Sequence, residues 1–255
     1  MRHAVITGGA SGIGEATARH LAADGIRVTI ADRDAERGCA VATDIMASGN
    51  VAAFRPLDVS DDEAVERLAS DLFATGGVDI LVNSAGILQN AVRLHDLDMA
   101  EFDRIIAVNL RGTVVACRAF GRRMCAAGSG AIVNLCSLTS LIASPQPAYG
   151  MSKAALKIMT ESLAAEYGPA NIRVNAVAPG YTLTPAMQQR IDEGTRNPDK
   201  MIAQSALRRL VSTPEVAEAI AFLASERASA ITGTVLPVDC GFLVASAYQA
   251  YATQP

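Results

Sequence analysis

Tyr149 and Lys153 stand four residues apart, at the start of a segment, 154–167, whose pattern predicts a helix. This spacing places both side chains on one helix face, about 6 Å apart along the axis. An ammonium group beside a phenol favours the phenolate, so Tyr149 could give or take a proton near neutral pH. Taken alone, a tyrosine and a lysine at this spacing are more often a surface pair than a catalytic one. The other elements of the chain must therefore decide between the two interpretations.

Short apolar runs alternate with helical patterns along the whole chain. Because uninterrupted apolar strands are buried on both faces, this alternation predicts a parallel sheet covered by helices on each side, a doubly wound α/β fold with one domain over residues 1–255. We expect Ser60 with Glu63 to form a capping box, and Thr213 to be the N-cap of a later helix. The strands are expected at 3–7, 27–31, 51–57, 79–82, 131–136, 171–180 and 234–238, and the other helices at 15–25, before Ala47, 60–74, 100–126 and 213–224.

Composition narrows the class of protein. The chain has 255 residues, 50% of them hydrophobic and 19% charged, which suffices for one large core. A net charge of −4 without basic runs predicts neither nucleic acid nor membrane as a partner. No apolar run approaches the ~20 residues of a membrane span, and there is no room for a signal peptide, so we expect a cytoplasmic protein. The five cysteines lack metal-binding spacing, which predicts reduced thiols and neither a disulfide nor a metal.

A glycine-rich turn, Gly8 to Gly14, follows the first strand and opens a helix. Such a turn lets the backbone approach a pyrophosphate, whose charge the helix N-terminal amides stabilise. Asp32 ends the second strand, where its carboxylate can bind the adenosine ribose hydroxyls and would repel a 2′-phosphate. Ser11 is not basic, so we expect NAD rather than NADP. Asp32 could instead be a solvated acid or a partner of Arg33.

Further polar and small residues lie where strands end. Asp58 could bind the adenine amino group with Val59 beside the ring, or could flank the next helix. Asn83, with Ala85 and Gly86, would let the backbone lie close to the ribose, or could form a simple turn.

Asn109 interrupts an apolar stripe on the helix expected at 100–126. A buried amide needs hydrogen-bond partners. From periodicity alone, a local structural role is as well supported as a functional one.

In these motifs the chain resembles the classical short-chain dehydrogenases/reductases over essentially its full length. The resemblance implies a Rossmann-type fold and a catalytic tetrad of Asn109, Ser137, Tyr149 and Lys153. Tyr149 would be the general acid/base, Lys153 would hold the nicotinamide ribose and lower the tyrosine pKa, Ser137 would orient the substrate oxygen, and Asn109 would anchor a proton-relaying water. It also implies NAD contacts from Gly8, Ser11, Ile13, Gly14, Asp32, Asp58, Val59, Asn83, Ala85, Gly86, Tyr149, Lys153, Pro179, Gly180, Thr182 and Thr184.

The chain departs from the family in one spacing. Ser137 precedes Tyr149 by twelve residues, one fewer than the commonest family separation, which would fall on Cys136. Ser137 is retained because Asn134-Leu135-Cys136-Ser137 aligns with the strand-end motif of the family.

The expected reaction interconverts a secondary alcohol and a ketone. Specificity is expected from residues 88–96, 138–148 and a substrate loop at about 185–210, whose polar groups suit a polyol or a sugar. The Pro145-Gln146-Pro147 segment is similar to that of some sugar-alcohol dehydrogenases. A 3-oxoacyl-thioester reductase and a non-catalytic cofactor-binding protein are the alternatives. The resemblance also implies a homo-oligomer, a dimer or tetramer, with Leu156, Met159, Leu163 and the segment 242–251 at its interfaces.

Overall fold

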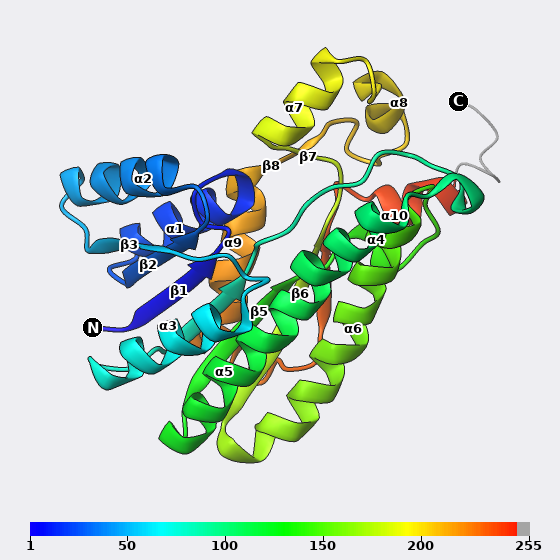
Figure 1. Ribbon diagram of the computed structural model, residues 1–255. Coiled ribbons are helices and arrows are strands. Elements are labelled where there is room, and N and C mark those ends of the chain that lie inside the picture. The colour runs from blue at the N-terminus through cyan, green and yellow to red at the C-terminus, as the bar shows by residue number, and fades with distance from the viewer. Residues whose placement is uncertain (249–255) are drawn as a thin grey trace.

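A seven-stranded parallel sheet in the order β3-β2-β1-β4-β5-β6-β9 forms the centre of the computed structural model, which describes residues 1–248 (Figure 1). Every pairing in this sheet is parallel, for example Val5 with Thr29 and with Leu81. The doubly wound α/β prediction is confirmed. The strands are β1 (His3–Thr7), β2 (Arg27–Asp32), β3 (Ala52–Pro56), β4 (Ile80–Asn83), β5 (Gly130–Leu135), β6 (Ile172–Pro179) and β9 (Val235–Val238).

Helices cover both faces of the sheet (Figure 1). Because successive strand residues point to opposite faces, Ala4 and Ile6 join the core beneath the first set of helices and Val5 the core beneath the second. The first set is α1 (Gly12–Ala23), α2 (Ala35–Ala47) and α9 (Thr213–Ala224), and the second is α3 (Asp62–Ala74), α5 (Gly112–Ala127) and α6 (Pro147–Tyr167).

The helix expected at 100–126 is not a uniform α-helix. It consists of α4 (Met99–Ile105), a π-helical segment (Ile106–Arg111) and α5. Asn109 lies in the π-helical segment and is fully buried. Periodicity could not reveal this change because one wider turn hardly alters an apolar stripe.

Two predicted caps are wrong by one residue. The N-cap of α3 is Asp61, whose carboxylate accepts from Ala64 N at 3.0 Å, while Ser60 Oγ donates to Asp58. A carboxylate at this position also interacts favourably with the positive end of the helix dipole. The N-cap of α9 is Ser212, not Thr213, and the carboxylate of Glu215 accepts from Ser212 N at 2.8 Å.

The substrate loop expected at 185–210, called the lid from here on, is not a simple loop. It contains α7 (Pro185–Asp192) and α8 (Pro198–Ala203). The flanking strands β7 (Thr182–Leu183) and β8 (Val211–Ser212) pair with each other, so the two ends of the lid lie side by side (Figure 1).

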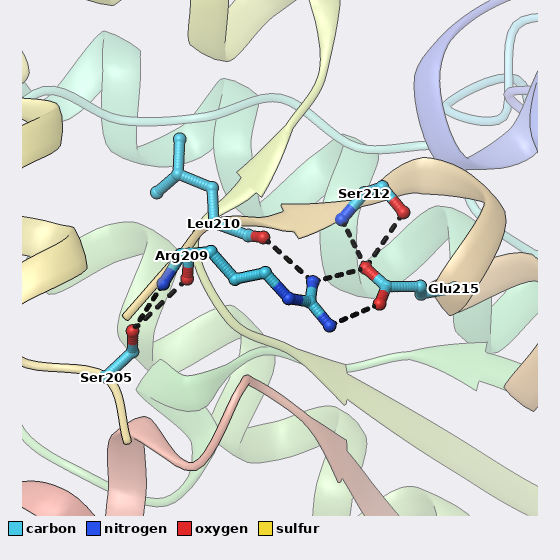
Figure 2. Close-up of polar contacts among 5 residues, drawn as sticks. All are labelled: Ser205, Arg209, Leu210, Ser212 and Glu215. Atoms are coloured by element: carbon cyan, nitrogen blue, oxygen red, sulfur yellow. Dashed lines mark hydrogen bonds and ion pairs between the residues drawn. The ribbon is translucent and has the colours of Figure 1, made fainter. Parts of the chain in front are cut away.

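An ion pair ties the end of the lid to α9 (Figure 2). Arg209 donates from Nη2 to Glu215 Oε1 at 2.6 Å and from Nη1 to Glu215 Oε2 at 2.9 Å. This pairing lowers the pKa of Glu215 to about 2, with the backbone amide of Ser212 contributing.

The faces expected to form oligomer contacts differ in part from the prediction. Leu156 is buried in the core and Met159 and Leu163 are half-buried, whereas Met151 and Ile158 are the exposed large apolar residues of α6. The C-terminal helix α10 (Phe242–Tyr248) covers part of the expected segment, and residues 249–251 lie outside the described residues. Among residues 1–248, no helix is both long and apolar enough to cross a bilayer.

Candidate active site

A cavity of about 520 Å³ opens beyond the carboxyl ends of the central strands. Its walls come from both sides of the boundary between β1 and β4, where the strand order reverses and doubly wound folds bind their ligands. The cavity is lined by the predicted residues Gly8, Ser11, Ile13, Asp32, Asp58, Val59, Ala85, Gly86, Ser137, Tyr149, Lys153, Pro179, Gly180, Thr182 and Thr184. Gly14, Asn83 and Asn109 are not among its lining residues.

The glycine turn brings backbone close to backbone. Gly8 has φ +67°, and a Cβ on it would lie 2.6 Å from the Cα of Ala85. Ser11 precedes α1 with an extended backbone and makes no side-chain capping bond, so the first amides of α1 keep donors for a ligand.

Gly14 and Asn83 support the site from behind. A Cβ on Gly14 would lie 2.1 Å from Gly8 O, so this glycine lets α1 pack against the turn. The Asn83 amide points into the interior, where Nδ2 donates to Asn134 Oδ1 at 2.9 Å. A contact from the Asn83 side chain to a cofactor is therefore not supported.

The carboxylate of Asp32 stands at the end of β2. Its Oδ2 accepts from Ala10 N and its Oδ1 from Asp34 N, each at 3.0 Å, which orients it toward the glycine turn. Arg33 and Arg37 also line the cavity, although neither was predicted to be a site residue. The cavity therefore holds both an acid that would repel a 2′-phosphate and bases that would attract one.

The Asp58 carboxylate is hydrogen-bonded to Ser60, two residues later in the chain. Its Oδ1 accepts from Ser60 N at 2.8 Å and from Ser60 Oγ at 2.6 Å, and these bonds lower the pKa of Asp58. Both proposed functions of Asp58 are compatible with this geometry, since it precedes α3 and also lines the cavity.

Tyr149 lies in the first turn of α6, and Ser137 lies just beyond β5. Burial raises the pKa of Tyr149, and a hydrogen bond with the Ser137 side chain opposes that rise. We expected Lys153 to lower this pKa to near neutrality. In the protein alone, desolvation is the larger effect and the phenol keeps its proton at neutral pH.

Lys153 lies one turn further along α6 and is 5% exposed. Its Nζ donates to Leu135 O at 2.7 Å and lies 5.7 Å from the centre of the Tyr149 ring. Burial lowers the pKa of Lys153 to about 8, so the ammonium form still predominates at pH 7.

Asn109 connects the π-helical segment to Ile87, a residue of the cavity wall. Its Oδ1 accepts from Ile87 N at 2.8 Å, and its Nδ2 donates to Ile87 O at 3.0 Å and to Ser152 Oγ at 3.4 Å. Gly86 lies close to both the Asn109 amide and the Lys153 ammonium. A Cβ on Gly86 would lie 3.4 Å from Asn109 Oδ1 and 3.7 Å from Lys153 Nζ. Of the predicted tetrad, Ser137, Tyr149 and Lys153 line one cavity, and Asn109 lies behind it, near Lys153.

Two threonines close the cavity on the side of the lid. Thr182 Oγ1 donates to Gly180 O at 3.1 Å, and Thr184 is the N-cap of α7, its Oγ1 accepting from Met187 N at 3.1 Å. Among residues 1–248, no group of three or more His, Cys, Asp and Glu side chains could hold a metal ion.

Comparison with known proteins agrees with this geometry. A family model described as enoyl-(acyl carrier protein) reductase matches residues 8–243. The chain belongs to the short-chain dehydrogenases/reductases. It is therefore an oxidoreductase that uses a nicotinamide cofactor, and the cradle of Gly8, Ser11 and Gly86 fits a dinucleotide.

Individual relatives match over nearly their full length. The cis-4-hydroxycyclohexanecarboxylate dehydrogenase of Sinomonas cyclohexanicum is 42% identical over 94% of this chain and 96% of its own. The L-tagatose-forming galactitol 2-dehydrogenase of Cereibacter sphaeroides is also 42% identical, over 94% of each chain. A solved structure of ElxO with NADP bound is 33% identical, covers 95% of this chain and 98% of its own, and has a TM-score of 0.89.

Proposed function

We propose that this protein is an NAD-dependent dehydrogenase that interconverts a secondary alcohol and a ketone, with Tyr149 as general acid/base. The observation that carries the proposal is that Ser137, Tyr149 and Lys153 line the same cavity as the glycine turn, with Lys153 Nζ 5.7 Å from the centre of the Tyr149 ring.

Each side chain has one task in the proposed mechanism. Ser137 donates to the substrate oxygen and orients it. In the reduction, the Tyr149 phenol gives its proton to that oxygen, and the Lys153 ammonium stabilises the phenolate that forms. In the oxidation, this phenolate takes the proton of the alcohol and becomes the phenol again. When bound, the nicotinamide accepts the hydride that leaves the carbinol carbon.

Lys153 also holds the nicotinamide ribose in this proposal, while Thr182 and Thr184 bind the carboxamide. Asn109 anchors a water that relays protons to Lys153. The water-anchoring function of Asn109 is supported by its position, because a Cβ on Gly86 would lie within 4 Å of both Asn109 Oδ1 and Lys153 Nζ.

NAD is the proposed cofactor because the Asp32 carboxylate lies where a 2′-phosphate would approach. Arg33 and Arg37 are the features that favour NADP instead, as bound in the ElxO structure. Affinities for NAD and NADP, measured by quenching of protein tyrosine fluorescence, distinguish the two, and equal or tighter NADP binding contradicts the proposal.

The proposed substrate is a polyol or sugar, in keeping with the galactitol dehydrogenase relative and with the polar loops beside Tyr149. The second candidate is a 3-oxoacyl thioester, favoured by the 41% identity to a solved structure of a putative betaketoacyl-ACP reductase. A panel of polyols, sugars, hydroxy acids and a 3-oxoacyl thioester, followed by cofactor absorbance, discriminates between these classes.

The decisive variant is Tyr149→Phe. It should keep NAD affinity and lose turnover by about three orders of magnitude or more, since only the proton-transfer group is removed. Wild-type turnover in the Phe variant contradicts the mechanism, whereas NAD binding without turnover of any substrate in the wild type supports a cofactor-binding protein.

We also propose a cytoplasmic homo-oligomer, either a dimer or a tetramer. The support is a set of apolar side chains that remain open to solvent on neighbouring helices, Val114 of α5 at 42% exposure and Ile158 of α6 at 59%. Light scattering coupled to size exclusion checks the state, and a monomer at micromolar concentration contradicts it.

A further inference from the structure

Gln89 is a polar side chain with 0% exposure in the segment between β4 and α4. Its position in a loop suggested contact with substrate. Instead, protein groups from three separate segments occupy its polar atoms, and Gln89 is absent from the cavity lining.

The first contact completes the helix that carries Tyr149. Gln146, the N-cap of α6, makes no side-chain capping bond, and Pro147 has no N–H. The amide of Tyr149 is one of the N-terminal groups that lack a partner within the helix. It donates to Gln89 Oε1 at 3.2 Å, so a residue sixty positions earlier caps this turn.

The remaining contacts fix Gln89 in turn. Its Nε2 donates to Glu101 Oε2 at 3.4 Å, which sets the orientation of the amide with its oxygen toward Tyr149. Its backbone carbonyl accepts from Gln146 Nε2 and, at 3.2 Å, from Nη2 of Arg196.

Arg196 belongs to the lid, between α7 and α8. A second lid residue, Arg190, donates from Nε to Asn90 Oδ1 at 3.2 Å. The lid thus reaches two consecutive residues of the 86–93 segment, and one of them caps the turn of Tyr149.

We propose that Gln89 is a positioning residue that holds Tyr149 in its catalytic orientation and couples it to the lid. Arg196 of the lid docks on the Gln89 carbonyl, and the Gln89 side chain fixes the amide of Tyr149. The inference rests on the proposed function of Tyr149.

The first test replaces the side chain while leaving the backbone carbonyl for Arg196. Gln89→Met should lower kcat by about tenfold or more, because a small displacement of the acid/base group is costly in the transition state, with NAD affinity unchanged. The apparent pKa of the pH–rate profile should also shift, which a general loss of folded protein does not cause. A kcat and pH profile equal to wild type overturn the inference.

A conservative exchange separates positioning from folding. The double variant Gln89→Glu with Glu101→Gln keeps an acceptor for the Tyr149 amide and a donor–acceptor pair between residues 89 and 101. It should recover most of the kcat that Gln89→Met loses. The melting transition shows whether Gln89→Met folds. If it does not, the double variant tests the positioning function by itself. A tenfold lower kcat in a folded double variant overturns the inference.

Coupling to the lid is tested with Arg196→Met and the double variant Gln89→Met/Arg196→Met. Arg196→Met should raise KM and lower kcat, and the combined loss of kcat should be smaller than the product of the single losses. Multiplicative losses overturn the coupling. Arg67→Met, which removes an exposed arginine from α3, is the matched control and should leave kcat and KM unchanged.

Turnover is first measured with NAD and one of two substrates, galactitol or cis-4-hydroxycyclohexanecarboxylate. The substrate panel follows. Wild-type turnover that Tyr149→Phe abolishes establishes the proposed function before any Gln89 variant is compared. Absence of that loss contradicts the proposed function, whereas its presence with unchanged Gln89→Met kinetics contradicts only the positioning function.

Discussion

Lys153 Nζ lies 5.7 Å from the centre of the Tyr149 ring while donating to the carbonyl of Leu135 at 2.7 Å. The ammonium is thus held beside the phenol by the end of strand β5, not by a carboxylate. A buried cation without an anionic partner is unfavourable to the fold, and its lowered pKa expresses that cost.

We predict that Lys153→Met abolishes turnover and stabilises the protein at pH 7 by roughly 1–3 kcal/mol, because the folded-state pKa of about 8 lies below the usual lysine pKa of 10.5. The cost of burying the ammonium is fully present below pH 8 and disappears as the pH rises toward 10.5. Melting temperatures of both proteins at pH 7 and pH 10 measure this, and the difference should shrink at pH 10. Lys157→Met, on the same helix and paired with Glu161, should show neither effect.

Asp32→Asn should raise NADP affinity by about tenfold, roughly 1.4 kcal/mol, since it removes a repelling charge and leaves Arg33 and Arg37 in the cavity. Titration with both cofactors measures the ratio of affinities. The exposed Asp44→Asn makes the same change in net charge at 62% side-chain exposure and should not alter it. An unchanged ratio in Asp32→Asn would show that the carboxylate does not discriminate between the cofactors.

Glu215→Gln should lower the melting temperature at neutral pH, because the charged pair with Arg209 is lost while an amide can still accept from Ser212 N. Since the pKa of Glu215 is lowered to about 2 from 4.5, its contribution is present above pH 4.5 and is lost as the pH falls toward 2. The difference in melting temperature between Glu215→Gln and wild type should therefore disappear as the pH falls toward 2. Glu63→Gln, which alters an exposed pair on α3, provides the reference.

Gly14→Ala should destabilise the protein by roughly 1–3 kcal/mol and weaken NAD binding, because the new methyl group would lie 2.1 Å from Gly8 O and displace the glycine turn. Chemical unfolding and cofactor titration measure the two effects. Gly168→Ala is the control, since a Cβ there meets nothing within 4 Å and the backbone is already helical. Equal stability of the two variants would exclude a close approach at Gly14.

The strands and most residues that line the cavity were predicted from the sequence, because short stretches of neighbouring residues mark strands and the points where strands end. Apolar runs bounded by glycine marked the strands, and the end of β2 marked Asp32. Burial and long-range pairing are not local properties, so Leu156 was placed on the surface, the lid helices were missed, and the environment that raises the pKa of Tyr149 was not anticipated.

Gln89 shows the same limit from the functional side. A glutamine in a loop has no pattern that distinguishes a ligand contact from a helix cap. Only the fold brings it to the first turn of α6, sixty residues later. The signal available in the sequence was the N-cap of that helix, where glutamine stands in a position at which a capping serine or aspartate is common.

The pairing of β7 with β8 gives the lid a common base, because residues 182 and 211 meet in one register. The lid therefore begins and ends at almost the same point, outside the seven-stranded sheet. A segment closed at its base can be exchanged as a cassette between homologous enzymes without breaking a core strand. Exchange of residues 185–210 would leave every strand of the seven-stranded sheet in place, and would keep the contact with Gln89 if the replacement carries an arginine able to reach its carbonyl.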